Sequence, residues 1–158
     1  MANLLAEHPE LLPLAAAWVA EQEARILQNG TPLTESEMAD AKAVGVQNPE
    51  RIRVMTGPTM PMPVDPLLAH AAVETKLISP DTDGMAFRYG IFLLQQHRNS
   101  RYLVTHECVH TGQYERLGSI EAFLGTYLLQ VDTMGYPEAT MEQEAINSAN
   151  DLVNLQSS

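Results

Sequence analysis

The residues best suited to chemistry lie in the run His106-Glu107-Cys108-Val109-His110, which has the form H-E-x-x-H. If this run is helical, its two histidines stand four residues apart and project to the same side. Two imidazoles placed in this way can bind one Zn²⁺ ion. The glutamate then projects beside the ion, where its carboxylate can hold and deprotonate a metal-bound water. The alternative for so short a pattern is a surface helix with scattered polar residues.

A catalytic zinc site built on two histidines needs one more protein ligand, and a carboxylate is a recognised third member of such a set. Two candidates, Glu142 and Glu144, lie in the downstream segment PEATMEQEA. Residues two apart on a helix face different directions, so only one of them can reach the ion. Ala145 follows the first by three positions, and a small residue there lets this helix pack closely on the motif helix. In the alternative, these acids only form a solvated face near a helix N-terminus.

The single cysteine of the chain, Cys108, lies inside the motif. It stands about 200° around the helical wheel from His106, so we expect a small core residue rather than a thiol ligand. One cysteine cannot form an internal disulfide, which fits a reducing cytoplasm. We therefore expect a cytoplasmic protein.

Composition excludes several classes of protein. The chain has 158 residues, of which 45% are apolar and 18% charged, as expected for one globular domain and not for a disordered chain. The net charge of −11 and the absence of a basic run argue against a nucleic-acid partner. The sequence has no apolar run of about 18 residues, so we expect no membrane span. The N-terminal stretch has no basic region and carries Glu7 and Glu10, so it does not resemble a signal peptide.

The elements that must position the motif follow from periodicity and from capping, turn and breaker residues. We expect helices over residues 10–29, 35–43, 66–78, 101–117, 120–134 and 138–155, and strands over 51–55 and 85–94. Thr34 to Glu37 form a capping box, and Gly118 ends the motif helix. The proline-rich segment TGPTMPMPVDP must be an extended loop, either a connector or a rim of the cleft.

These elements predict one α+β domain over residues 1–158, with a helical part over 1–48 and a part with the sheet and metal site over 49–158. We expect a helical majority and a small antiparallel sheet. A strand, a tight turn and then the motif helix would place an edge strand beside the zinc site, where a peptide could add by backbone pairing. Gly90, inside the second strand, indicates a bulge or a close approach of another backbone.

Three segments, HECVHTGQYERLG, FLGTYL and GYPEATMEQEA, together resemble the compact gluzincin-type zinc metallopeptidases of bacteria, over about residues 85–148. Residues 44–63 also resemble the upstream part of a small bacterial set with this motif. The resemblance implies a zincin-like fold with an HExxH helix at the active site. It implies zinc ligation by His106, His110 and Glu142, and a general-base role for Glu107.

The resemblance also extends to residues behind the ligands. Gln113 matches a glutamine that often follows the motif, which implies that it supports the site by hydrogen bonding. Ile146 is a departure, because many relatives have an aspartate there that orients the first histidine. That histidine is therefore left without an assigned partner.

Several side chains could stabilise the oxyanion that forms during hydrolysis. Tyr136 is the best placed, because it stands in the Gly-Tyr-Pro loop just before the helix of the third ligand. Tyr127 is expected in the core, and His97 is expected in a solvated turn. Tyr102 is a further candidate.

The sequence therefore predicts a zinc-dependent metallopeptidase that hydrolyses peptide bonds through a metal-activated water, with Glu107 as general base. Its partner would be a peptide or protein substrate. One alternative is a non-catalytic binding module on a zinc-stabilised zincin fold, and another is a zinc-free structural protein. The intact glutamate of the motif favours the enzyme.

Overall fold

The computed structural model describes residues 4–79 and 81–155. The helices are α1 (Leu4–Glu7), α2 (Leu11–Asn29), α3 (Glu35–Ala43), α4 (Pro66–Glu74), α5 (Arg101–Leu117), α6 (Ile120–Met134) and α7 (Thr140–Leu155), with short 3-10 turns at Pro49–Arg51 and Gln95–His97. The strands are β1 (Thr31–Pro32), β2 (Arg53–Gly57), β3 (Gly84–Phe87) and β4 (Gly90–Leu94). The predicted helical majority and the α+β class are confirmed. None of the helices within the described residues combines the length and apolarity that a membrane crossing requires.

The sheet has the strand order β1-β2-β4-β3. Pairing is antiparallel between β1 and β2 and between β3 and β4, but parallel between β2 and β4. The prediction of an antiparallel sheet is therefore wrong, and the sheet is mixed. The physical reason is the long connection through α4, which brings β4 back beside β2 in the same direction, whereas a short hairpin joins β3 to β4.

The predicted strand over 85–94 is two strands, because the chain reverses at Arg88 and Tyr89. Arg88 has φ 60, in the left-handed region that a tight turn requires. Buried Glu23 of α2 holds this turn, since it accepts from Arg88 Nε at 2.8 Å and from Tyr89 N at 2.9 Å. Gly90 forms no bulge but pairs with Phe87. A Cβ there would meet the Cβ of Ile26 at 3.0 Å, so close approach is the correct explanation.

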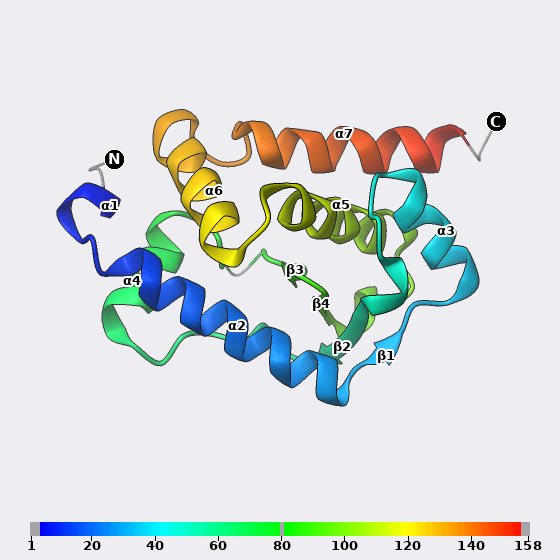
Figure 1. Ribbon diagram of the computed structural model, residues 1–158, viewed down its shortest axis with the longest axis horizontal. Coiled ribbons are helices and arrows are strands. Elements are labelled where there is room, and N and C mark those ends of the chain that lie inside the picture. Colours follow the sequence, from blue (N-terminus) through cyan, green and yellow to red (C-terminus); the bar gives the residue numbers. More distant parts are fainter. Residues whose placement is uncertain (1–3, 80, 156–158) are drawn as a thin grey trace.

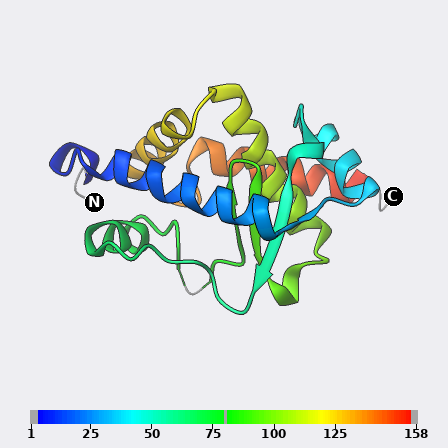
Figure 2. The same ribbon diagram turned by 60° about the horizontal axis from the view of Figure 1, so that its bottom comes forward.

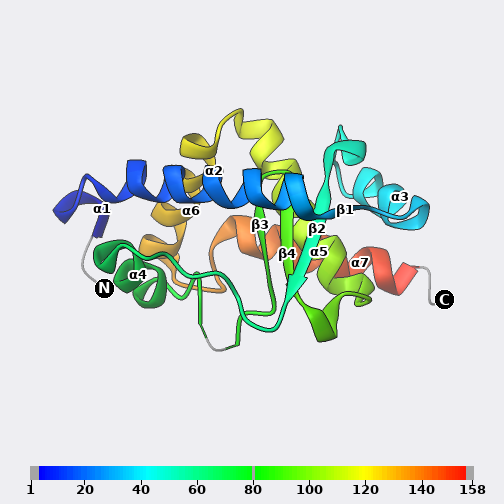
Figure 3. The ribbon, with the colours of Figure 1, turned by 90° about the horizontal axis from the view of Figure 1, so that it is seen from below.

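The elements are stacked in layers. In Figure 1, α7 lies uppermost, followed by α5, the sheet and α2. Figure 2 and Figure 3 show α2 crossing in front of the strands, with α5 and α7 on the far side. Side chains of β4 alternate accordingly: Phe92 packs in the cluster on the α2 side, whereas Ile91 and Leu93 pack with Val104 and Cys108 of α5.

Helix α5 has defined ends. The Ser100 hydroxyl accepts from Leu103 N at 3.2 Å at its start, and Gly118, with φ 93, ends it as predicted. Two clamps fix it to the N-terminal part of the chain. Arg101 donates to both carboxylate oxygens of Asp40 at 2.8 Å, and Glu115 accepts from Gln47 N at 2.8 Å. The motif helix is therefore held by contacts along its whole length.

Two helix boundaries differ from the prediction. Helix α4 ends at Glu74 rather than near residue 78, because Thr75 turns its hydroxyl back to Ala71 O at 2.8 Å and Lys76 has φ 61. Helix α7 begins at Thr140, two residues later than expected, after the Gly-Tyr-Pro segment. The capping box at Thr34 and Glu37 is present as predicted.

Candidate metal centre and cleft

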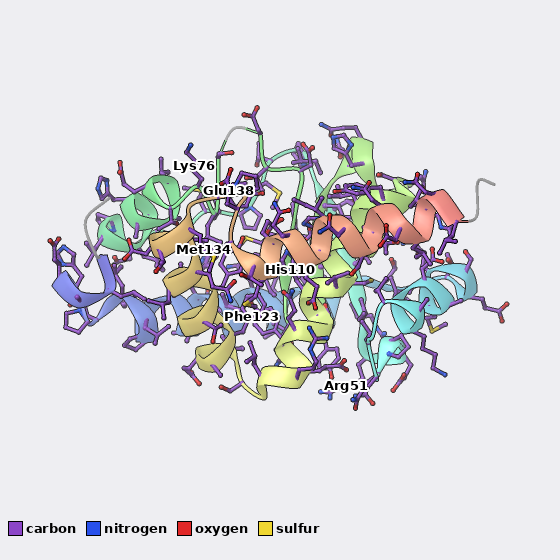
Figure 4. The ribbon with its side chains drawn as sticks, turned by 90° about the horizontal axis from the view of Figure 1, so that it is seen from above. Arg51, Lys76, His110, Phe123, Met134 and Glu138 are labelled. Atoms are coloured by element: carbon purple, nitrogen blue, oxygen red, sulfur yellow. The ribbon has the colours of Figure 1, made fainter. Side chains whose placement is uncertain are left out.

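Helices α5 and α7 bring three potential metal ligands together. His106 Nε2 lies 2.8 Å from Glu142 Oε1, and His110 Nε2 lies 3.2 Å from Glu142 Oε2. All three side chains are buried, and one donor atom from each lies within 4.8 Å of the others. Figure 4 shows His110 beside the first turns of α7, with Phe123 of α6 nearby. This group could hold a metal ion.

The close packing of α7 on α5 comes from small residues on the inward face of α7. Ala145 and Ala149 follow Glu142 by three and seven positions and are fully buried. At this spacing the three residues share one helical face. Alanines on that face bring the two helix axes near each other, and the carboxylate at its start then reaches the histidines. The structure therefore places Glu142, as predicted, beside the motif.

Glu144 faces the other way. Its Oε1 accepts from Gln113 Nε2 at 2.7 Å and from the Arg116 guanidinium at 2.8 Å, and its side chain is 45% exposed. Only one of the two glutamates lies among the histidines, as the helical geometry requires. Glu144 is not surrounded by solvent alone, however. Its hydrogen bond with Gln113 connects it indirectly to His110.

That chain fixes the tautomer of His110. Gln113 Nε2 donates to Met141 O at 2.9 Å and to Glu144, and both partners are acceptors only. The amide oxygen of Gln113 must then face His110 Nδ1, 2.8 Å away. Nδ1 therefore carries a proton and donates it, so the neutral ring presents the lone pair of Nε2 to the centre of the site. The supporting role expected of Gln113 matches this geometry.

His106 differs, because its Nδ1 is buried and has no hydrogen-bond partner among the described residues. Its ring lies 5.8 Å from the ring of Tyr102 and 5.1 Å from that of His110. The absence of a partner agrees with the expectation that Ile146 cannot supply one. In the metal-free protein, the contact with the charged Glu142 requires a proton on Nε2. A metal ion on Nε2 would leave the proton on Nδ1, where no described residue accepts it.

The contacts among His106, His110 and Glu142 determine which of these side chains carry a charge. Burial would lower the pKa of His110, but its hydrogen bond to Glu142 outweighs burial and raises this pKa to about 9. Burial would raise the pKa of Glu142, but the hydrogen bonds from both histidines hold it well below its ordinary value. In the metal-free protein the carboxylate is therefore charged, and the added positive charge of an ion would take the place of the protons that now lie between these side chains.

Glu107 is also buried and lies beside this group. Burial raises the pKa of its carboxyl, although the neighbouring charges of His106 and His110 act in the opposite direction. A Cβ on Gly84 would stand 3.4 Å from Glu107 Oε2, so the strand backbone passes close to this carboxylate. A buried carboxylate with a raised pKa in this position is suited to accept and return a proton.

A cavity of about 260 Å³ lies in front of the centre. His106, Glu107, His110 and Glu142 form its floor, and its walls include Tyr102, Phe123, Tyr136 and residues 81–86. It is large enough to hold several non-hydrogen atoms of a substrate. The motif thus faces a space that a ligand can enter, unlike the polar stripe of an ordinary surface helix.

Strand β3 supplies the edge beside the site. The prediction that an edge strand lies there holds, but the strand is β3 rather than β4, since β4 is enclosed between β2 and β3. Asp83 O accepts from Leu94 N at 2.9 Å, so by alternation Gly84 and Ala86 turn their N–H and C=O groups away from β4. Both residues line the cavity.

The four candidates for oxyanion stabilisation separate clearly. Tyr102, Tyr127 and Tyr136 all line the cavity, and burial together with the charges of Glu142 and Glu107 raises the pKa of Tyr136 to about 12. Its hydroxyl is thus a donor at neutral pH. His97 lies beside Asp83 at 3.4 Å in an open position and is not part of the cavity wall.

Tyr127 is buried, as expected, but it is more than a core residue. Its hydroxyl donates to Glu142 Oε2 at 2.8 Å, and its side chain also lines the cavity. The sequence contains a signal for this contact: a tyrosine on the apolar face of α6 must find a hydrogen-bond partner for its hydroxyl.

Cys108 is fully buried among apolar side chains, and burial raises the pKa of its thiol. It faces away from the centre, as the helical wheel predicts, and takes no part in it.

Comparison with known proteins adds no relative. No protein-family model, no curated protein and no solved structure matches this chain. The assignment of function therefore rests on the geometry of the centre and on the resemblance carried by its motifs.

Proposed function

We propose that this protein is a zinc-dependent metallopeptidase with a zincin-like fold, and that His106, His110 and Glu142 are its zinc ligands. One observation carries the proposal. Two imidazole nitrogens and a carboxylate oxygen converge from α5 and α7 at a buried point, with a further buried carboxylate beside them and a cavity in front.

The donor set fits the metal. Two histidines and one glutamate form a recognised catalytic zinc set, in which the fourth position stays open for water or substrate. Here the side of the group that no protein ligand occupies faces the cavity. Structural zinc sites close all four positions with protein ligands, so this arrangement favours a catalytic role.

A bound Zn²⁺ would polarise the substrate carbonyl and lower the pKa of water at the site toward about 7. Glu107 would take the proton from the attacking water on its carboxylate and pass it to the leaving amine. Its burial and raised pKa suit a group that must hold that proton between the two steps. Tyr136 would donate its hydroxyl hydrogen to the developing oxyanion.

The free edge of β3 would orient the substrate. A peptide that pairs with Gly84 would extend along the wall of the cavity, past the carboxylate of Glu107. The backbone of Ala86 is already engaged, because its carbonyl accepts from the Tyr114 hydroxyl at 3.5 Å and its N–H is hydrogen-bonded to Glu107. A side chain at Gly84 would not fit, because its Cβ would approach Leu93 to 2.7 Å and Glu107 Oε2 to 3.4 Å.

The first test is the metal content of protein purified without added metal, by elemental analysis. We expect one Zn²⁺ per chain. Glu107→Gln should keep the zinc and the fold but lose at least about 100-fold in peptide hydrolysis, because the amide cannot accept the proton. Glu121→Gln, an exposed change at the start of α6, serves as the control and should hydrolyse peptides like the parent.

Equal hydrolysis by Glu107→Gln and the parent would remove the general-base role. Absence of bound metal in the parent would overturn the proposal altogether. Stoichiometric zinc without hydrolysis of any of a diverse set of peptides would instead favour a non-catalytic binding module on the same fold.

A further inference from the structure

Tyr127 is held rigidly beside the candidate centre, in the wall of the cavity. Its ring stacks on that of Phe123 with an interplanar angle of 11°, and it meets the ring of His110 edge-on at 6.0 Å between centroids. The side chain is 4% exposed. Its hydroxyl thus has one fixed direction, and this direction leads to Glu142 Oε2 at 2.8 Å.

This contact makes the two oxygens of Glu142 inequivalent. Oε1 faces only His106, at 2.8 Å, whereas Oε2 faces both His110, at 3.2 Å, and the hydroxyl of Tyr127. A metal ion would displace the protons that the imidazoles now share with the carboxylate. It would not displace the phenolic proton, because the O–H of Tyr127 has no other acceptor among the described residues.

We propose that Tyr127 is a positioning residue that holds Glu142 in a one-oxygen binding mode and leaves Oε1 as the ligand atom for the metal ion. The hydrogen bond draws electron density toward Oε2 and fixes the plane of the carboxylate, which opposes the rotation that two-oxygen binding requires. This inference rests on the proposed metal site.

The consequence is selectivity among metals. Zn²⁺ and Co²⁺ accept four ligands, whereas Mn²⁺ prefers more oxygen donors, which a two-oxygen carboxylate helps to supply. A carboxylate restricted to one oxygen thus favours the four-coordinate ions. The same contact separates Tyr127 from Tyr136: the first hydroxyl is committed to the ligand, and the second remains available in the cavity.

The test is Tyr127→Phe, which removes only the hydroxyl and keeps the aromatic stack. Tyr114→Phe is the matched control, because Tyr114 is equally buried and stacks on Phe123 at 3.6 Å, but its hydroxyl reaches only Ala86 O at 3.5 Å. Metal-free parent and both variants are titrated with Zn²⁺ and Mn²⁺ against a chromophoric chelator. Visible spectra are then recorded with Co²⁺, whose absorption intensity reports four-coordination.

We expect Tyr127→Phe to weaken Zn²⁺ binding by about 10- to 100-fold. Mn²⁺ binding should weaken much less, so the preference for Zn²⁺ falls. Its Co²⁺ spectrum should lose the intensity of four-coordination, while the Tyr114→Phe spectrum matches that of the parent. Thermal unfolding of the metal-free proteins checks that both variants are folded.

Unchanged Zn²⁺ affinity and an unchanged Co²⁺ spectrum in Tyr127→Phe would overturn the inference. Equal losses for Zn²⁺ and Mn²⁺, or a parent spectrum of higher coordination, would overturn it as well. A parent that binds no metal would instead refute the proposed function, on which the inference rests, so the two failures are distinguishable.

Discussion

The two histidines of the motif stand one helical turn apart, yet the protein supports them differently. His110 donates from Nδ1 to Gln113, which is itself held by Met141 O and Glu144. The Nδ1 of His106 is buried and finds no partner among the described residues. The tautomer that a metal ion needs, with the proton on Nδ1, is thus supported by a hydrogen bond at His110 and by none from the described residues at His106.

The difference comes from the helix that covers each ring. Gln113 reaches His110 and α7 at once, so the docking of α7 supplies both the third candidate ligand and the orientation of this ring. No such bridge reaches His106. A buried polar atom without a partner costs about 1–3 kcal/mol, so this half of the centre is the less well supported half. The C-terminal helix therefore organises one side of the site only.

The difference between the two histidines matters for metal binding only if both of them bind the same ion. We expect the double variant His106→Ala with His110→Ala to lose metal binding entirely, because a single carboxylate cannot retain zinc. Elemental analysis of the purified variant measures this directly. Zinc retained in stoichiometric amount would mean that the ligands lie elsewhere and that the asymmetry has no bearing on the metal.

Removal of the support behind His110 should have the next largest effect. Gln113→Leu leaves Nδ1 of His110 without an acceptor, so we expect zinc affinity to fall by about 10- to 100-fold. Thr105→Val is the control on the other side, because the buried hydroxyl of Thr105 has no hydrogen-bond partner in the described part of the chain and the valine is nearly isosteric. We expect its affinity to match the parent, since an unpaired hydroxyl can be removed at little loss.

Chelator titration of these two variants measures the contrast. Similar losses of zinc affinity in both variants would show that the centre is equally sensitive to a buried change near either histidine. The difference in hydrogen bonding between the two rings would then have no consequence for metal binding. A loss of zinc affinity in Gln113→Leu alone would show that the hydrogen bond at His110 contributes to metal binding.

Much of the site could be predicted because its signals are local. The spacing of His106 and His110, the caps at Ser100 and Gly118 and the alanines of α7 all act within a few residues of the sequence. A helix once capped and given one small-residue face can pack closely in only one orientation. The choice of Glu142 over Glu144 rested on Ala145 together with the resemblance of the motifs.

The features that escaped prediction depend on long connections. The parallel pairing of β2 with β4 arises from the path of the chain through α4, which no alternation pattern records. The turn at Arg88 depends on Glu23, far away on α2, and so a hairpin was mistaken for a single strand. The contact of Tyr127 with Glu142 also joins two helices, and only the general need of a buried hydroxyl hinted at it.

The smallest effects should appear at the outer end of the hydrogen-bond chain. Loss of Glu144 still leaves Gln113 with Met141 O as an acceptor, so the amide keeps its orientation. The ion pair of Glu144 with Arg116 is about half exposed on both sides, 45% and 48%, and such pairs are worth about 0–1 kcal/mol. We expect Glu144→Ala to weaken zinc binding by at most about 10-fold, and Arg116→Ala by at most about 5-fold.

The order of the three losses is the decisive result. Zinc titration should rank them as Gln113→Leu, then Glu144→Ala, then Arg116→Ala, because each residue lies one hydrogen bond farther from His110. If Glu144→Ala empties the site, the carboxylate at 144 is a ligand itself. The helical register that places Glu142 among the histidines would then be wrong. In that case Glu144 would be both the third ligand and the group that supports His110 through Gln113. The difference in hydrogen bonding between the two histidines would then need another explanation.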